Sequence, residues 1–237
     1  MPHPNPAFYP RPLAASSRWL SACLLMASAL LAQAQTQPAC GSLSNAYGPF
    51  DYRSDRAKLP IVETAHFTDV VEALIRGSSA TRPGPDIDYT LRAIPNHHRA
   101  LIAMMRLGAK ENTDQPSGSR YSVDCWFERA ALFRPDDSIV RMIYSTYLNS
   151  KSRVPEATRQ LDMVAAVAHD NPLTHFNLGL HYFDLKQYEK ALAQDHAAAA
   201  LGWQRTELRE QLRAVGKWVA PAQPSPSPVA ENDPTGH

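Results

Sequence analysis

Two adjacent histidines, His97 and His98, stand at the start of an apolar run, IPNHHRALIAMMRL. Histidine is the side chain that most often binds metals and transfers protons near neutral pH. On a helix, however, consecutive residues point about 100° apart, so the two rings cannot both bind one metal ion without distortion. Pro95-Asn96 instead predicts that one helix ends and another begins here. We therefore expect both histidines to have structural or surface roles.

Other side chains with chemical potential occur at helical spacing. His181 and Asp184 are three residues apart, a spacing that can orient an imidazole or contribute to a metal site. The sequence indicates no third ligand, so we expect a polar helix face. The pair Met104-Met105 is expected to fill core space, because methionine packs adaptably and no Cys or His lies at a chelating step from it.

The established catalytic motifs are absent from the sequence. It contains no GxSxG, Walker loop, GxGxxG, HExxH, CxxC or EF-hand pattern. The sequence therefore predicts no catalytic residue, metal ligand or cofactor, and it gives no basis for naming a reaction.

The N-terminus has the pattern of an export signal. Arg11 and Arg18 precede the apolar run at 19–32, and Ala32-Gln33-Ala34 has the small-x-small form of a cleavage site. We expect residues 1–34 to be removed by cleavage near Ala34, giving a periplasmic or secreted protein. Lys+Arg then falls from 24 to 22 against 23 acids, so the net charge changes from +1 to −1 and a nucleic-acid partner is not expected. No later apolar run is longer, so we expect no transmembrane helix.

The cysteines fit an exported protein. Cys23 leaves with the signal, and the remaining pair predicts a Cys40 to Cys125 disulfide, with two unpaired buried thiols as the alternative. Cys23 ends a lipoprotein-like LSAC stretch, but most of the apolar core follows it instead of preceding it. Cleavage near Ala34 is therefore the expectation, and lipidation at Cys23 is kept as the minor alternative.

A 34-residue period organises the second half of the chain. It relates positions of similar type in successive segments, namely Tyr144 to Leu178, Ser145 to Gly179, Leu148 to Tyr182, Ala157 to Ala191, Phe127 to Leu161 and Asp195, and Ala130 to Val164 and Ala198. The clearest copy is NLGLHYFDLKQYEKA, residues 177–191. A repeat of this length predicts stacked helical hairpins, with small Gly179 and Ala191 where two helices approach closely.

This pattern resembles the tetratricopeptide repeat (TPR) family, and together with the export signal it suggests an exported bacterial member. The resemblance implies an all-α fold in which helical hairpins form a right-handed superhelix. Two repeats are expected at 138–205, and two degenerate hairpins at 65–137, of which the first pairs 67–77 with the helix DIDYTLRAI. The stretch 110–120 is expected to be a lengthened turn between helices.

The remaining segments are assigned from composition. Residues 35–64 are expected to form an extended arm pinned at Cys40, with Tyr47, Phe50 and Tyr52 as packing anchors. Residues 206–219 predict a capping helix with a polar outer face. Residues 220–237 are rich in Pro and Ser and are expected to be disordered.

In the TPR family, the first helix of each hairpin lines a concave groove that commonly binds a peptide or protein. The resemblance implies a non-catalytic scaffold whose partner-binding residues are Arg99, Ile102, Arg106, Met142, Thr146, Asn149, Phe176, Leu180 and Phe183. Some of these positions are alternatively core residues between hairpins, and the arm from Cys40 to Arg53 is a candidate for blocking the groove. The competing hypothesis is an exported enzyme or metal-binding protein that uses histidines of the concave face.

Overall fold

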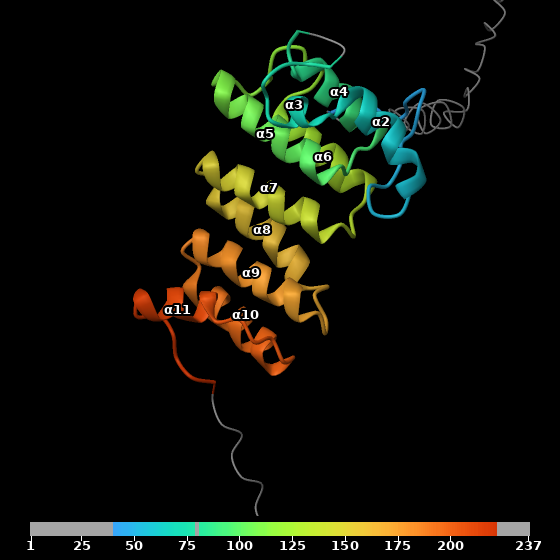
Figure 1. The fold of residues 1–237 in the computed structure, drawn as a ribbon. Coiled ribbons are helices and arrows are strands. Elements are labelled where there is room, and N and C mark those ends of the chain that lie inside the picture. The colour runs from blue at the N-terminus through green and yellow to red at the C-terminus, as the bar shows by residue number, and fades with distance from the viewer. Residues whose placement is uncertain (1–39, 79–80, 222–237) are drawn as a thin grey trace, which may run out of the picture. The chain divides into compact units, whose positions relative to one another are not determined.

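The computed structural model describes residues 40–78 and 81–221, which contain helices and no strands. The helices are η1 (Arg56–Lys58), α2 (Leu59–His66), α3 (Asp69–Glu72), α4 (Gly84–Ala93), α5 (His98–Glu111), α6 (Val123–Phe133), α7 (Ser138–Ser150), α8 (Val154–Ala165), α9 (Pro172–Asp184), α10 (Tyr188–Ala200) and α11 (Glu207–Ala214), as Figure 1 shows. The all-α prediction is confirmed, and all of these helices belong to one unit that begins at Leu43.

Some predictions concern residues outside the ranges that the structure describes. The predicted signal peptide at 1–34, with Cys23 in it, and the last part of the predicted tail, 222–237, lie outside the described residues. None of the helices in the described part is long and apolar enough to cross a membrane. Cys40 and Cys125 form a disulfide, which confirms the predicted pairing.

The helix boundaries follow from local capping chemistry. α4 ends at Ala93 and α5 begins at His98, with His97 as the N-cap whose Nδ1 accepts from the Ala100 amide at 3.1 Å. α9 begins at Pro172, and the Asn171 side chain accepts from the Thr174 amide at 3.0 Å. A proline in the first turn fits because that position needs no intrahelical donor. The predicted boundaries at residues 95–96 and 171–172 are therefore confirmed.

Two helical hairpins carry the repeat period. α7 packs most extensively on α8, and α9 on α10; a short turn joins each pair, so the partners are antiparallel (Figure 1). The period-related positions are all buried, and they are Phe127, Ala130, Tyr144, Ser145, Leu148, Ala157, Leu161, Val164, Leu178, Gly179, Tyr182, Ala191, Asp195 and Ala198. The period therefore marks the side chains that pack within and between the hairpins.

A polar contact also repeats with the same period. Arg141 Nε donates to the Pro135 carbonyl at 3.0 Å, and its Nη1 donates to Gln160 Oε1 at 3.0 Å. In the next hairpin, His175 Nε2 lies 2.7 Å from the His169 carbonyl, and its Nδ1 lies 2.7 Å from Gln194 Oε1. Each member of the second set occupies the position of its counterpart one full period later. The two hairpins are therefore tied at the same place by the same kind of contact.

The N-terminal part differs from the expected arrangement. Leu59–His66 is helical, so the prediction of an extended arm over 35–64 is wrong for its last residues. The helix forms because Pro60 suits the first turn and the spacing of Leu59 and Val62 places both in a core against α4. The predicted anchors Tyr47, Phe50 and Tyr52 pack on this same core.

The first predicted hairpin is also not as expected. Within 67–77 only Asp69–Glu72 form a helix, and Leu74 has a φ of 56°, a left-handed conformation that ends it. α4 packs on α2 and α5. The helix that packs on α4 from the N-terminal side is therefore α2, which precedes the predicted segment 67–77.

α11 covers the end of the last hairpin and contacts both α9 and α10. It spans Glu207–Ala214, shorter than the predicted 206–219, and buries Leu208 and Leu212. Asp195 stands where earlier segments have Phe127 and Leu161, yet it is buried, with its Oδ2 at 3.3 Å from Arg209 Nε and from Trp218 Nε1. Arg209 of α11 and Trp218 after it thus supply polar partners for Asp195, the residue whose type differs from that of its repeat equivalents.

Candidate functional site

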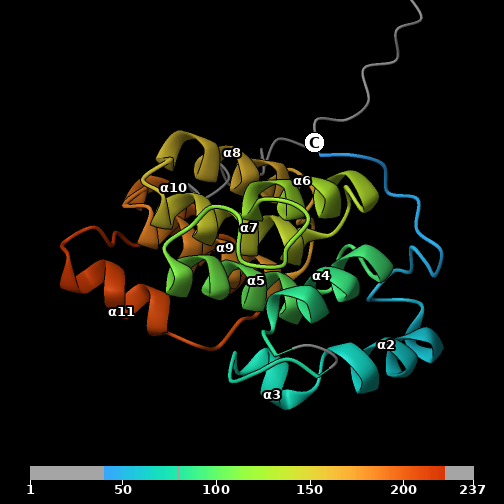
Figure 2. The same cartoon turned by 90° about the horizontal axis from the view of Figure 1, so that it is seen from above.

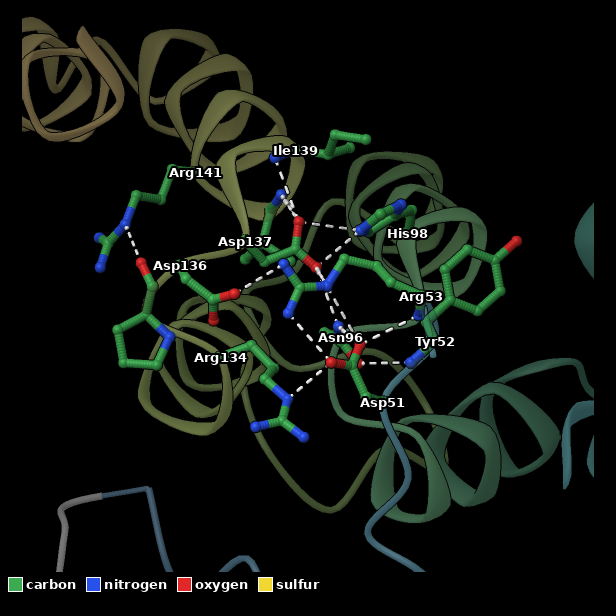
Figure 3. Close-up of polar contacts among 12 residues, drawn as sticks. Asp51, Tyr52, Arg53, Asn96, His98, Arg134, Asp136, Asp137, Ile139 and Arg141 are labelled. Atoms are coloured by element: carbon green, nitrogen blue, oxygen red, sulfur yellow. Dashed lines mark hydrogen bonds and ion pairs between the residues drawn. The ribbon is translucent and has the colours of Figure 1, made fainter. Parts of the chain in front are cut away.

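The histidine pair belongs to a cluster of polar residues at the turns that precede α5 and α7. Figure 3 shows this turn cluster, which we define as Asp51, Tyr52, Arg53, Asn96, His98, Arg134, Asp136 and Asp137. Its members come from three places in the sequence: the segment before η1, the α4 to α5 turn and the α6 to α7 turn. Pro95-Asn96 and Pro135-Asp136 occupy equivalent positions between one helix and the next, and the two turns lie side by side (Figure 3).

Asn96 is at the centre of the turn cluster and is fully buried. Its Nδ2 donates to Asp51 Oδ1 at 2.7 Å and to Asp137 Oδ2 at 2.8 Å. Its Oδ1 accepts from the Tyr52 amide at 2.9 Å. One amide side chain therefore bridges two buried carboxylates and fixes the backbone of the N-terminal segment.

Two arginines supply the positive charge that these carboxylates require. Arg53 Nη2 lies 3.0 Å from Asp51 Oδ2, and its Nη1 lies 2.9 Å from Asp136 Oδ2. Arg134 Nε lies 2.7 Å from Asp51 Oδ2, an ion pair that lacks the alignment of a hydrogen bond. Charges buried at a turn are tolerated only when they are paired and hydrogen-bonded in this way.

The pKa values of the buried acids reflect these contacts. Burial raises the pKa of Asp51, but hydrogen bonds from Arg53 and Asn96 outweigh it and leave the pKa well below its usual range. Burial likewise acts against Asp137, and hydrogen bonds from His98 and Asn96 bring the net pKa below the ordinary value. Both groups are therefore carboxylates at neutral pH.

The two histidines bind different acids and do not converge on one point. His98 Nε2 lies 2.9 Å from Asp137 Oδ2, whereas His97 Nε2 lies 3.0 Å from Glu63 Oε1 on α2. Burial lowers the pKa of His97 to about 4 despite its hydrogen bond to Glu63. His97 is therefore a neutral ring that caps α5 and ties it to α2.

The turn cluster has the contacts of a structural joint. Each of its carboxylates faces an arginine, a histidine or an amide, and so none is placed as a free base. Among residues 40–78 and 81–221, no group of three or more ligand atoms close enough to hold a metal includes His97, His98 or His181. The geometry thus assigns the histidine pair to positioning and capping.

The predicted partner-binding residues separate into groups by their exposure. Arg99, Ile102, Arg106 and Thr146 are exposed, Asn149, Leu180 and Phe183 are partly buried, and Met142 and Phe176 are buried. Phe176 packs on Trp203, with ring centroids 5.2 Å apart, and Arg205 covers it. Met142 and Phe176 are therefore core residues, as the alternative for this set allowed.

Two pockets lie along α5, α7 and α9, the helices that carry the predicted set. The α5/α7 pocket has a volume of about 260 Å³ and is lined by Met105, Gly108, Ala109, Asn112, Thr113, Val123, Tyr147, Ser150 and Lys151. The smaller α7/α9 pocket is lined by Ser145, Thr146, Asn149, His181, Asp184 and Leu185. The predicted Thr146 and Asn149, and the spaced pair His181 and Asp184, thus meet at one place.

These two pockets are equivalent positions of the repeat. On the first helix, Met105 and Ala109 correspond to Ser145 and Asn149 one repeat later, once the longer connection between α5 and α6 is taken into account. On the second helix, Tyr147, Ser150 and Lys151 correspond to His181, Asp184 and Leu185, which follow by one regular period. One kind of depression therefore recurs between successive first helices, with different side chains in each copy.

The α7/α9 pocket has its own electrostatic character. His181 Nδ1 lies 3.5 Å from Thr146 Oγ1, and burial lowers the pKa of His181 although Asp184 acts in the opposite direction. The ring is therefore neutral at neutral pH, and Asp184 at the edge is exposed. This arrangement offers hydrogen bonds and one negative charge to a bound group.

The N-terminal segment lies away from both pockets. Asp51, Tyr52 and Arg53 contact the turns before α5 and α7 (Figure 3). Apart from Val123 at the start of α6, the residues that line the two pockets lie on the C-terminal halves of α5, α7 and α9 or just after them. These three residues therefore leave the pockets open.

Sequence reasoning did not predict the roles of Asp51, Arg53 and Asp137. One signal in the sequence pointed to Asp137: it follows Pro135-Asp136 at the N-cap of α7, just as His97 follows Pro95-Asn96 at the N-cap of α5. Nothing in the local pattern of GPFDYR shows that it pairs with two turns that lie far along the sequence.

Comparison with protein-family models, with curated proteins and with solved structures gives no match for this chain. The functional argument therefore depends on the residues and geometry described above.

Proposed function

We propose that this chain is an exported TPR-like protein that binds an extended segment of a partner protein along α5, α7 and α9. The observation that carries the proposal is the recurrence of one pocket at repeat-equivalent positions of successive first helices. A ligand that runs across the helices would meet a pocket at each step of the repeat. An extended peptide, whose alternate side chains point the same way, suits such a series.

Exposed apolar residues on the same helices support a protein partner. Ile139 and Leu173 occupy the same repeat position at the starts of α7 and α9, and they are 47% and 49% exposed. Ile102 on α5 is 36% exposed. Single exposed apolar residues are common, but repeat-related ones on one set of helices favour a contact surface.

The remaining parts of the proposal come from the sequence. We propose that the hairpins form the right-handed superhelix that the TPR resemblance implies, and that residues 1–34 direct export to the periplasm before cleavage near Ala34. In this setting the protein acts as a non-catalytic scaffold. The histidines of the competing hypothesis have separate partners: His97 contacts Glu63, His98 contacts Asp137 and His181 contacts Thr146.

Site-specific photo-cross-linking in the periplasm tests the proposal. A photoreactive phenylalanine analogue at Ser150 or Thr146, beside the two pockets, should capture the same partner. The analogue at Arg159, which is exposed on α8, is the matched control and should not capture it. Ser150→Trp, which fills the α5/α7 pocket, should reduce capture from position 146. Equal capture from Arg159, or capture that Ser150→Trp leaves unchanged, would contradict the proposal.

A further inference from the structure

A further pocket lies away from the two pockets just discussed and was not predicted from the sequence. It has a volume of about 430 Å³ and lies between the start of α7 and the end of α8. Its walls include Pro135, Asp136, Arg141, Met163, Val164 and Val167. A volume of this order is in the range of sites for small molecules.

The pocket combines one charged group of each sign with an apolar wall. Met163 and Val167 are 48% and 53% exposed, so apolar surface is open to a ligand. Asp136 has a 70% exposed side chain and uses Oδ2 for its ion pair with Arg53. Arg141 forms no ion pair with any residue of the described ranges. Its hydrogen bonds go to neutral acceptors, namely the Pro135 carbonyl, Gln160 Oε1 and, at 3.1 Å, Met163 Sδ.

The next hairpin shows that the fold does not need a cation at this position. His175 is the equivalent of Arg141, and it makes the two equivalent contacts, to His169 and Gln194, with an imidazole. The hydrogen bonds that tie the hairpin are therefore available without a permanent charge. The guanidinium of Arg141 is an addition that the packing does not explain.

We propose that this pocket binds a small apolar α-amino acid as its zwitterion. The ligand carboxylate pairs with Arg141, the ammonium group pairs with Asp136, and the side chain lies against Met163, Val164 and Val167. Arg141 uses Nε and Nη1 for its protein contacts, so Nη2 is the donor for the ligand carboxylate, and a hydrogen bond between two charged groups is stronger than one between neutral groups. A simple anion fits less well, because the Asp136 carboxylate stands at the same pocket.

Calorimetric titration of the full chain with L-leucine at pH 8 tests the proposal. We expect saturable binding to the native protein. Arg141→His should weaken it by about tenfold or more, because the ion pair with the ligand is lost while the contacts seen at His175 keep the hairpin intact. Asp136→Asn should weaken it to a similar extent. Arg159→Gln, which removes an exposed arginine elsewhere on α8, is the matched control and should bind as the native chain does.

Ligand analogues separate the two charge contacts. 4-Methylpentanoate lacks the ammonium group and 3-methylbutylamine lacks the carboxylate, so each should bind about tenfold more weakly than leucine. The dipeptide Gly-Leu moves the ammonium group away and should also bind more weakly. Equal binding of 4-methylpentanoate would overturn the role of Asp136, and equal binding of Gly-Leu would assign the site to peptide C-termini instead of amino acids.

The location is checked by NMR of methionine methyl groups. Leucine should shift the signal of Met163 and leave that of the buried Met142 unchanged. Unchanged thermal unfolding of Arg141→His shows that lost binding is not lost folding. The proposal is wrong if leucine gives no saturable binding up to about 1 mM, or if Arg141→His binds it as well as the native chain does.

Discussion

At the scale of single residues, the turn cluster shows why two adjacent histidines are not a metal site. His97 is directed to Glu63 and His98 to Asp137, so each ring completes a separate contact. Asn96, between them and the N-terminal segment, satisfies two carboxylates at once. The cost of burying Asp51 and Asp137 is offset by hydrogen bonds that join distant parts of the sequence.

His97 makes the stability of the protein depend on pH between about 4 and 6.5. Its folded pKa lies below the unfolded value, so the unfolded chain binds more protons in this window. The stabilisation is complete above pH 6.5 and is lost as the pH falls toward 4, a change of about 3 kcal/mol in the free energy of unfolding.

Urea unfolding at pH 7 and pH 4.5 measures this effect. His97→Asn retains an N-cap without a titrating ring, so its stability should change less over the window than that of the native chain. Residual dependence is expected from His181, whose pKa is also lowered by burial. The exposed His169→Asn is the control and should follow the native chain. An identical pH dependence in His97→Asn would contradict the prediction.

Asn96→Ala should destabilise the protein by about 3 kcal/mol, because it removes one hydrogen bond from each of two buried carboxylates and takes away the acceptor of the Tyr52 amide. Hydrogen exchange at the Tyr52 amide should become faster. Asn149→Ala on α7 makes a suitable control, because that side chain is only partly buried and makes none of these contacts. A loss of less than about 1 kcal/mol for Asn96→Ala would show that the turn cluster does not join the segments.

At the scale of elements, α11 completes the last hairpin. Figure 2 shows it as a separate rod beside α9 and α10, and its Leu208 is fully buried. A methyl group on Gly179 of α9 would overlap Leu208 Cδ2, so a side chain at position 179 would force the buried Leu208 of α11 to shift. The residues after α11 continue this cover, since Trp218 reaches Asp195.

Gly179→Ala should therefore destabilise the chain by about 1–3 kcal/mol, although alanine favours a helix more than glycine does. The measurement is urea unfolding followed by circular dichroism. Leu208→Ala removes the overlapping methyl groups, so Gly179→Ala should cost less in a Leu208→Ala background than in the native chain. Additive effects of the two substitutions would place the strain somewhere other than this contact.

At the scale of the molecule, successive hairpins are joined by buried tyrosines. Tyr144 and Tyr147 of α7 donate to Asp124 of α6, and Tyr182 of α9 donates to Asp162 of α8 at 2.7 Å. Burial, together with the neighbouring aspartates, raises the pKa of all three phenols, which keeps them as donors at neutral pH. Stability is thus distributed over neighbouring interfaces, as in a linear array.

Native-state hydrogen exchange should show the consequence. α7 packs against α5, α6, α8 and α9, whereas α11 packs mainly against the last hairpin, α9 and α10. Amides of α7 should therefore exchange at the highest opening free energy and those of α11 at a lower one. Equal protection of both helices would indicate one all-or-none unit. A chain ending at Arg205, which lacks α11, should lose protection in α10 before α7.

The sequence by itself determined the helical class, the 34-residue period, the helix boundaries at Pro95-Asn96 and Asn171-Pro172, and the disulfide. These features depend on helix capping and on residue spacing, which can be recognised from the local sequence. Only the tertiary structure decided which residues are covered: Phe176 lies under Trp203, and α2 takes the place of the predicted partner of α4. It also decided that Asp51 and Arg53 meet Asn96 and Asp136. Such contacts depend on which distant segments pack together, and no local pattern records that choice.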